Sequence, residues 1–125
     1  MFTILDDKTI CLTRGDTANI AFTASLEDGA PYVFTPGEII RFSVFEKKNC
    51  SNVVLSKDTE VTQQSESVMV RLTKQETKIG EIISKPTDYW YEVELNPDTN
   101  PQTIVGYDDW GPKVFRLYPE GGGKR

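Results

Sequence analysis

The sequence predicts a single antiparallel, immunoglobulin-like β-sandwich with one short helical turn. Three observations support this: apolar residues fall at every second position in four segments, turn residues separate those segments, and one helix signal precedes a late aromatic strand. Period-two alternation is typical of a strand with one buried face, because successive side chains of a strand point to opposite sides. Several such strands, with a turn about every ten residues, indicate an all-β sandwich.

The first half of the chain is expected to form two short strands and two longer ones. The short ones are residues 2–5 and 9–13, after which Arg14-Gly15-Asp16 turns the chain. Residues 17–26 form the longest alternation and end before Asp28-Gly29, a strong hairpin signal. Residues 39–47 are the next strand. The predicted inward rows of these two strands are Ala18, Ile20, Phe22, Ala24 and Leu26, then Ile40, Phe42 and Val44.

The second half is expected to hold six more strands and the helical turn. Residues 53–56 and 60–63 are weaker strands, and 67–73 is a strong one. Thr73 and Glu76 match a capping box, in which two side chains satisfy the free N–H groups of a helix start. A short helix is therefore predicted near residues 73–80, ended by Gly80. The last strands are residues 87–96, 102–107 and 113–118. The predicted inward rows of this half are Val68, Val70 and Leu72, then Tyr89, Tyr91, Val93 and Leu95.

The segment from Pro86 to Val93 is similar to the corner of fibronectin type III domains, where a tyrosine hydroxyl bonds back to a turn. Tyr89 or Tyr91 would have that role. The alternative is that both tyrosines are ordinary aromatic strand residues, which are common in sheets.

Length and composition limit the classes of protein that this chain fits. Residues 1–120 are expected to form one domain, and the glycine-rich residues 121–125 a flexible tail. A net charge of −5 with scattered basic residues argues against a nucleic-acid partner. No stretch approaches the roughly 20 apolar residues of a membrane helix, so no membrane partner is expected. The first residues lack the pattern of a signal peptide, which favours synthesis in a cytoplasm.

The residue types present disfavour catalysis and metal binding. The chain has no histidine, which is the commonest general base and metal ligand. Its two cysteines, Cys11 and Cys50, are predicted to be free thiols rather than a disulfide. The carboxylate pairs are interpreted as turn residues or a solvated strand face; they are Asp6-Asp7, Asp108-Asp109, and Glu92 with Glu94. We therefore expect a protein that is not an enzyme, with no catalytic residues, no cofactor and no metal.

Aromatic residues are the candidate site. If Tyr91 and Val93 point inward, Trp90 points outward, and Phe45 is outward by the same reasoning. Trp110 lies in a loop, and Tyr107 precedes that loop. Exposed aromatic residues mark protein interfaces or stack on sugar rings. The alternative is that these side chains belong to the core of a second sheet. Arg14-Gly15-Asp16 spells an integrin-binding tripeptide, but a tight turn is the better interpretation.

Several segments resemble the N-terminal domain of phage baseplate upper proteins and related tail or fibre proteins of Gram-positive bacteria. They are Leu12-Thr13-Arg14-Gly15-Asp16-Thr17-Ala18, Asp28-Gly29-Ala30-Pro31-Tyr32, Ile40-Arg41-Phe42-Ser43-Val44, Tyr89-Trp90-Tyr91-Glu92-Val93-Glu94-Leu95, Gln102-Thr103-Ile104-Val105 and Phe115-Arg116-Leu117. The resemblance implies a non-enzymatic sandwich that attaches a baseplate, tail or fibre component. It carries over no catalytic residue.

The expected function is therefore a structural or interaction module of a phage or prophage particle. Its partners would be other virion proteins or further copies of itself, and it would be made in the bacterial cytoplasm before it enters the virion. The alternative function is a carbohydrate-binding sandwich in which Trp90, Trp110 or Tyr107 stacks on a sugar. A glycoside hydrolase is the least favoured class, because the chain is short for a catalytic cleft.

Overall fold

The computed structural model describes residues 2–5, 8–26, 28–80, 84–106, 108 and 111–120. The described residues form nine strands and no helix, so the all-β prediction is confirmed. The expected tail, residues 121–125, lies outside the described residues. The strands are β1 (Phe2–Ile4), β2 (Ile10–Thr13), β3 (Ala18–Phe22), β4 (Ile39–Phe45), β5 (Val53–Glu60), β6 (Val68–Leu72), β7 (Thr87–Leu95), β8 (Gln102–Val105) and β9 (Lys113–Tyr118).

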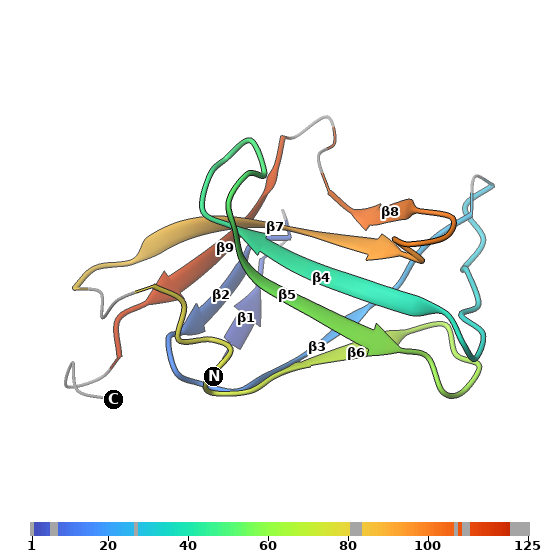
Figure 1. Cartoon of the computed structure of the whole chain (residues 1–125), viewed down its shortest axis with the longest axis horizontal. Coiled ribbons are helices and arrows are strands. Elements are labelled where there is room, and N and C mark those ends of the chain that lie inside the picture. Colours follow the sequence, from blue (N-terminus) through green and yellow to red (C-terminus); the bar gives the residue numbers. More distant parts are fainter. Residues whose placement is uncertain are drawn as a thin grey trace.

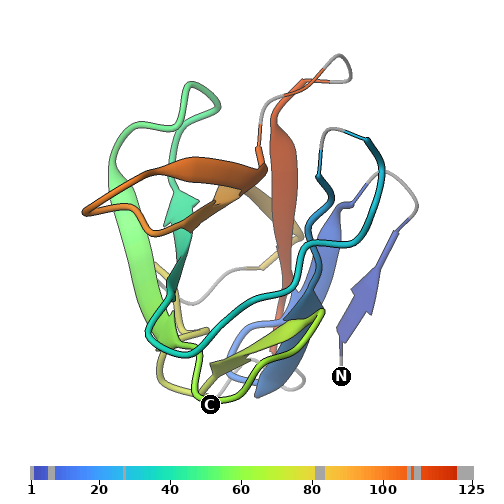
Figure 2. The same ribbon diagram turned by 90° about the vertical axis from the view of Figure 1, so that its right-hand side faces the viewer.

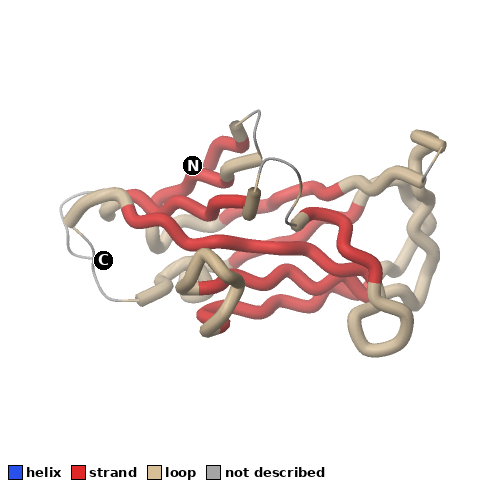
Figure 3. The backbone as a smooth tube through the Cα atoms, turned by 90° about the horizontal axis from the view of Figure 1, so that it is seen from above, coloured by secondary structure: helices blue, strands red, loops and turns tan. Residues whose placement is uncertain are grey.

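These strands make two packed layers, as expected of a sandwich (Figure 1). The larger sheet has the order β1-β2-β9-β7-β4-β5, and β8 pairs with the same edge of β7 as β9 does, farther along the strand. The smaller sheet is the pair β3-β6, which lies across the inner face of the larger sheet. The view along the strands shows that the larger sheet is strongly curled around this pair (Figure 2). Strands and loops account for the whole described backbone (Figure 3).

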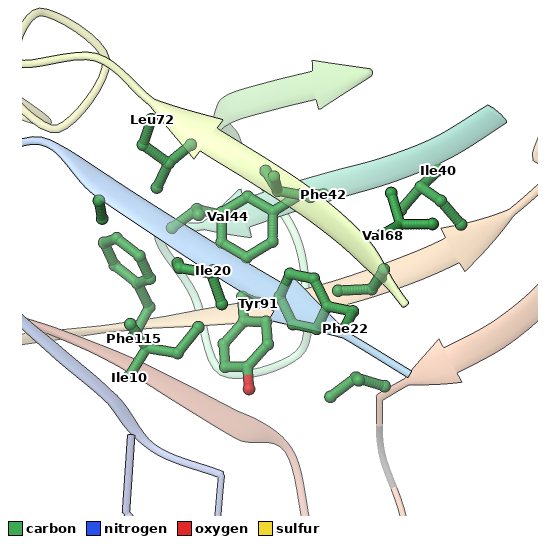
Figure 4. Packing of buried hydrophobic residues seen from close by; sticks show 14 of the residues in the cluster. Ile10, Ile20, Phe22, Ile40, Phe42, Val44, Val68, Leu72, Tyr91 and Phe115 are labelled. Carbon is green, nitrogen blue, oxygen red and sulfur yellow. The ribbon is translucent and has the colours of Figure 1, made fainter. Parts of the chain in front are cut away.

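The core lies between the two sheets and is built from the predicted rows. Phe42 is fully buried, and its ring centroid lies 5.9 Å from that of Phe22, 5.6 Å from that of Tyr91 and 6.0 Å from that of Phe115. These side chains converge from β3, β4, β7 and β9 (Figure 4). The other predicted inward residues that are buried are Ala18, Ile20, Ile40, Val44, Val68, Val70, Leu72, Tyr89, Val93 and Leu95. Period-two alternation therefore identified the inner face of four strands correctly.

The prediction of a wholly antiparallel sandwich is wrong at one pair of strands. β2 and β9 pair in parallel, with Ile10 opposite Phe115 and Leu12 opposite Leu117. β9 is also antiparallel to β7, so it joins the N-terminal strands to the rest of the larger sheet. Alternation reveals which face of a strand is buried but not the direction of its neighbour, so the sequence pattern could not exclude this arrangement.

The predicted helical turn is also wrong. Both capping-box hydrogen bonds form: the Thr73 N–H donates to the Glu76 carboxylate (2.9 Å), and the Glu76 N–H donates to the Thr73 hydroxyl (3.2 Å). They close a turn, but no helix follows among the described residues. The hydroxyl of buried Thr77 donates to the Asp16 carbonyl (2.8 Å), which draws the chain to the β2–β3 turn. Contacts with distant parts of the chain therefore override the local helix signal.

Two strands differ in extent from the prediction. β3 stops at Phe22, because the chain beyond it pairs with its own return segment at Ser25 and Pro31. Leu26, expected to be inward, is therefore 48% exposed. The two weak strands predicted at 53–56 and 60–63 are replaced by one continuous strand, β5, which ends at Glu60, so residues 61–63 are not part of a strand. The polar residues in the middle of β5 break the apolar alternation, so the sequence pattern did not predict one strand. An edge strand accommodates such residues, and Lys57 forms an ion pair with Glu76 (3.0 Å).

The segment between β3 and β4 is held by the carboxylate of Glu38. One oxygen accepts the Tyr32 hydroxyl (2.6 Å) and the Asn96 amide (3.2 Å), and the other accepts the Thr35 N–H (2.8 Å). Burial raises the pKa of the Glu38 carboxyl, but the hydrogen bonds from its three neighbours lower it by more, so the net pKa is below its ordinary value. This carboxylate therefore ties the segment to the end of β7 in its charged form.

We expect Glu38 to make the fold less stable in acid. A carboxyl whose pKa is lowered by folding adds stability above its unfolded pKa of about 4.3, and this stability is lost as the pH falls through the folded value. Glu38→Gln should therefore show a smaller drop in urea midpoint between neutral and acidic pH than the unmodified protein. The matched control is Glu60→Gln, at an exposed residue of β5. Equal acid sensitivity of the Glu38→Gln variant and the unmodified protein would contradict this role.

Candidate functional site

The outer face of the larger sheet carries the candidate site, on the side opposite the core. In the strand register, Trp90 of β7 lies between Phe45 of β4 and Val114 of β9, and Phe45 lies opposite Val53 of β5. We call Val53, Phe45, Trp90 and Val114 the outer apolar row. It crosses four neighbouring strands. Trp90 and Val114 are partly exposed, and Val53 is 56% exposed.

Trp90 therefore lies on the face that the sequence predicted, but Phe45 is less accessible than expected. Phe45 points away from the core row of β4, yet it is only 6% exposed. It lies next to Trp90 in the register and beside an irregularity in the β4–β5 pairing. Cross-strand neighbours on one face contact each other, so a large ring at position 90 shields its neighbour. Phe45 thus supports the row but is not a free platform for a ligand.

Charged groups border the outer apolar row on both sides. On one side, the Arg116 Nε lies 2.7 Å from an oxygen of Asp88. On the other side, beyond Glu92 and Ser43, the Arg41 Nε lies 2.8 Å from an oxygen of Asp58. A central apolar strip with a polar, charged border is the composition of a protein interface.

Glu92 and Glu94 lie on this same face, as their spacing predicted. Burial raises the pKa of the Glu92 carboxyl, and the nearby charge of Glu94 raises it further. Burial also raises the pKa of the Cys50 thiol, with a smaller contribution from Glu92. A raised pKa keeps a thiol protonated, which is the opposite of what activates a nucleophilic cysteine. Cys11 and Cys50 are both free thiols, as predicted.

The Arg14-Gly15-Asp16 turn is structural, in agreement with the preferred interpretation. Gly15 has φ of +88° in a tight turn closed by a hydrogen bond from the Asp16 N–H to the Thr13 carbonyl (3.0 Å). The Arg14 side chain is buried, so no adhesion receptor can reach it. Its guanidinium donates to the carbonyls of Ile79 (3.1 Å) and Gly80 (2.7 Å) and to the Glu120 carboxylate (2.5 Å). The local sequence pattern does not predict this buried ion pair, because its two residues are far apart in the chain.

The two candidate tyrosines of the corner point inward and are buried. The Tyr91 hydroxyl donates to the Lys8 carbonyl (2.6 Å), so it ties β7 to the connection between β1 and β2. Burial raises the pKa of the Tyr89 hydroxyl, and the charge of Glu46 adds to this. Tyr107 and Trp110, the other two candidate aromatic residues, lie outside the described residues, as do Asp6, Asp7 and Asp109.

The described part of the chain contains no group of three or more histidine, cysteine, aspartate or glutamate side chains placed to hold a metal ion. Over the same residues, no helix has the length and apolar character needed to cross a membrane. Comparison with models of protein families, with curated proteins and with solved structures found no match to this chain.

Proposed function

We propose that this protein is a non-enzymatic interaction module that binds another protein chain through its outer apolar row. The observation that carries the proposal is the line of Val53, Phe45, Trp90 and Val114 across one sheet face, bordered by ion pairs. A partly exposed tryptophan near the centre of an apolar strip is typical of the residues that dominate binding energy at interfaces.

The setting that we propose is a phage or prophage particle, in which the module attaches a baseplate, tail or fibre component. The resemblance of the sequence segments to baseplate upper proteins supports this setting. The two packed sheets and the late aromatic strand support the immunoglobulin-like classification that goes with it. The partner would be another virion protein or a second copy of the chain.

A non-enzymatic role agrees with the chemistry of the described residues. The chain lacks histidine, and the raised pKa of Cys50 disfavours thiolate chemistry. A sugar-binding platform is the second candidate function. Trp90 with Glu92 beside it favours that candidate, because an aromatic ring and a carboxylate are its usual components. Phe45 is too buried to extend the platform.

Trp90→Ala tests the proposal directly. Trp90 is partly exposed, so the thermal midpoint should change little, whereas binding should weaken by about 2 kcal/mol, roughly thirtyfold. The measurements are sedimentation over a range of concentrations and co-purification with the products of the genes next to the one that encodes this chain. Met69→Ala, which removes an exposed apolar side chain from the smaller sheet, is the matched control.

The possible results separate the candidates. Loss of protein association in Trp90→Ala alone supports the interface, and neighbouring tail or baseplate genes support the virion setting. Loss of glycan binding with protein association unchanged favours the sugar-binding alternative. A large loss of thermal stability, with association and glycan binding both unchanged, would show that Trp90 only stabilises the fold, and it would refute the proposed interface.

A further inference from the structure

Strand β8 has one edge with which no other strand of the described residues pairs. Its residues pair with Val93, Glu94 and Leu95 of β7. The Asn96 N–H donates to the Ile39 carbonyl (2.7 Å), so the backbone groups of Leu95 and Val93, one and three positions earlier, point away from β4 and toward β8. Thr103 lies opposite Glu94, between these hydrogen-bonding positions. Its N–H and C=O therefore point away from β7 in the plane of the sheet, toward the side where the described residues provide no neighbouring strand.

A cavity of about 450 Å³ lies beside this edge, between β8 and the segment that follows β3. Its apolar lining includes Ala24, Leu26, Leu95 and Ile104, and none of its lining residues is charged. Leu26, one of the lining residues, is 48% exposed, and Ile104 is partly buried. The volume falls within the usual range for binding cavities and is ample for a large apolar side chain.

The absence of charge distinguishes β8 from the edge strand on the opposite side of the sheet. β5 carries Lys57, Asp58 and Glu60, and charged residues are the usual means of preventing unwanted strand pairing. The sequence of β8, Gln102-Thr103-Ile104-Val105, carries none in a chain that is 26% charged. An uncharged strand edge beside an uncharged cavity suits a neutral, extended ligand.

We propose that β8 is a strand-addition site for an extended, uncharged peptide segment of a partner protein. The segment would pair its backbone with the N–H and C=O of Thr103 and place an apolar side chain in the cavity, which is a recurrent mode of peptide recognition. A second folded copy of the chain fits less well. A strand edge of four residues offers much less contact than the roughly 1,000 Å² that a stable interface buries. This site is separate from the outer apolar row, so it does not depend on the function proposed above.

Two pairs of variants test the two halves of the site. Thr103→Pro removes the outward N–H and leaves the hydrogen bonds from Gln102 and Val105 to β7 in place, whereas Thr103→Val keeps that N–H. Leu26→Asp puts a charge at the cavity, whereas Met69→Asp puts the same charge at a similarly exposed residue of β6 that belongs to neither proposed site. The probe is a display library of random dodecapeptides selected against the unmodified protein, and the best binders are then synthesised for titration.

We expect selected peptides that alternate apolar and neutral residues and that slow hydrogen exchange at the Thr103 amide. Thr103→Pro and Leu26→Asp should each weaken binding at least about tenfold, the effect of one lost backbone hydrogen bond or one excluded side chain. The two control variants should bind like the unmodified protein. If Thr103→Pro strongly lowers the thermal midpoint, peptide binding by Leu26→Asp, compared with binding by its control, tests the site instead.

Three results would overturn the proposal. The first is a library that yields no binder at this edge. The second is a set of peptides that bind equally well to Leu26→Asp. The third is self-association of the free protein that Leu26→Asp abolishes and Met69→Asp does not, which would make a second copy the occupant.

Discussion

Phe42→Ala is expected to lower the free energy of unfolding by about 3–5 kcal/mol. The Phe42 ring is fully buried and contacts three other aromatic rings from both sheets, so its removal leaves a cavity that no single neighbour can fill. Phe22→Ala should have a similar effect, because Phe22 is the partner of Phe42 on the smaller sheet. Urea denaturation followed by tryptophan fluorescence measures both.

The control for this prediction is Met69→Ala, at an exposed residue of β6. It should lower the free energy of unfolding by much less than the two core variants do, because the Met69 side chain has little buried surface to lose. Losses below about 1 kcal/mol for both phenylalanine variants would mean that the two sheets do not share one tightly packed core.

Arg14→Met is the second substitution for which we expect a large effect, a loss of about 3–5 kcal/mol. The Glu120 carboxylate is buried, and Oε2 already lacks a hydrogen-bond partner among the described residues. Removal of Arg14 would leave this charge buried and unpaired, and it would also strand the carbonyls of Ile79 and Gly80. Arg14→Lys should not restore the stability, because an ammonium group cannot reproduce the planar fork of donors.

The double variant Arg14→Met/Glu120→Leu separates the ion pair from simple packing. It should be more stable than Arg14→Met alone, because it removes the stranded charge. Arg41→Met is the matched control: Arg41 also contacts two carboxylates, Asp58 and Asp98, but these are exposed, so its loss should cost about 1 kcal/mol or less. Equal costs for Arg14→Met and Arg41→Met would contradict the role assigned to the buried pair.

Residue alternation predicted the part of the fold that depends on one strand at a time. One assumption, that each strand buries one face, was enough to predict the inward rows, which include Ile40, Phe42 and Val44 and also Tyr89, Tyr91 and Val93. The parallel pairing of β2 with β9 depends on which strands meet, and the rows look the same either way. The capping box at Thr73 predicted its hydrogen bonds correctly but not the chain beyond them, because Thr77 bonds to the distant Asp16.

The candidate sites show the same division between local and distant information. The side of the sheet that Trp90 occupies follows from its position in the strand, so the sequence predicted it. The shielding of Phe45 depends on its neighbour across the sheet, which the sequence does not reveal. The cavity beside β8 unites residues near positions 24 and 104 that are far apart in the chain, so no local pattern could have indicated it.

The position of β9 has a consequence for how the protein forms during synthesis. β9 lies between β2 and β7 and pairs with both. While the ribosome is still making the chain, the hairpin of β1 and β2 has no place in the larger sheet, and Ile10 and Leu12 remain without their final contacts. Such long-range pairing slows folding and prolongs the exposure of apolar segments to other chains. A chain that lacks β9 would also lose the attachment of β1 and β2 to the rest of the larger sheet.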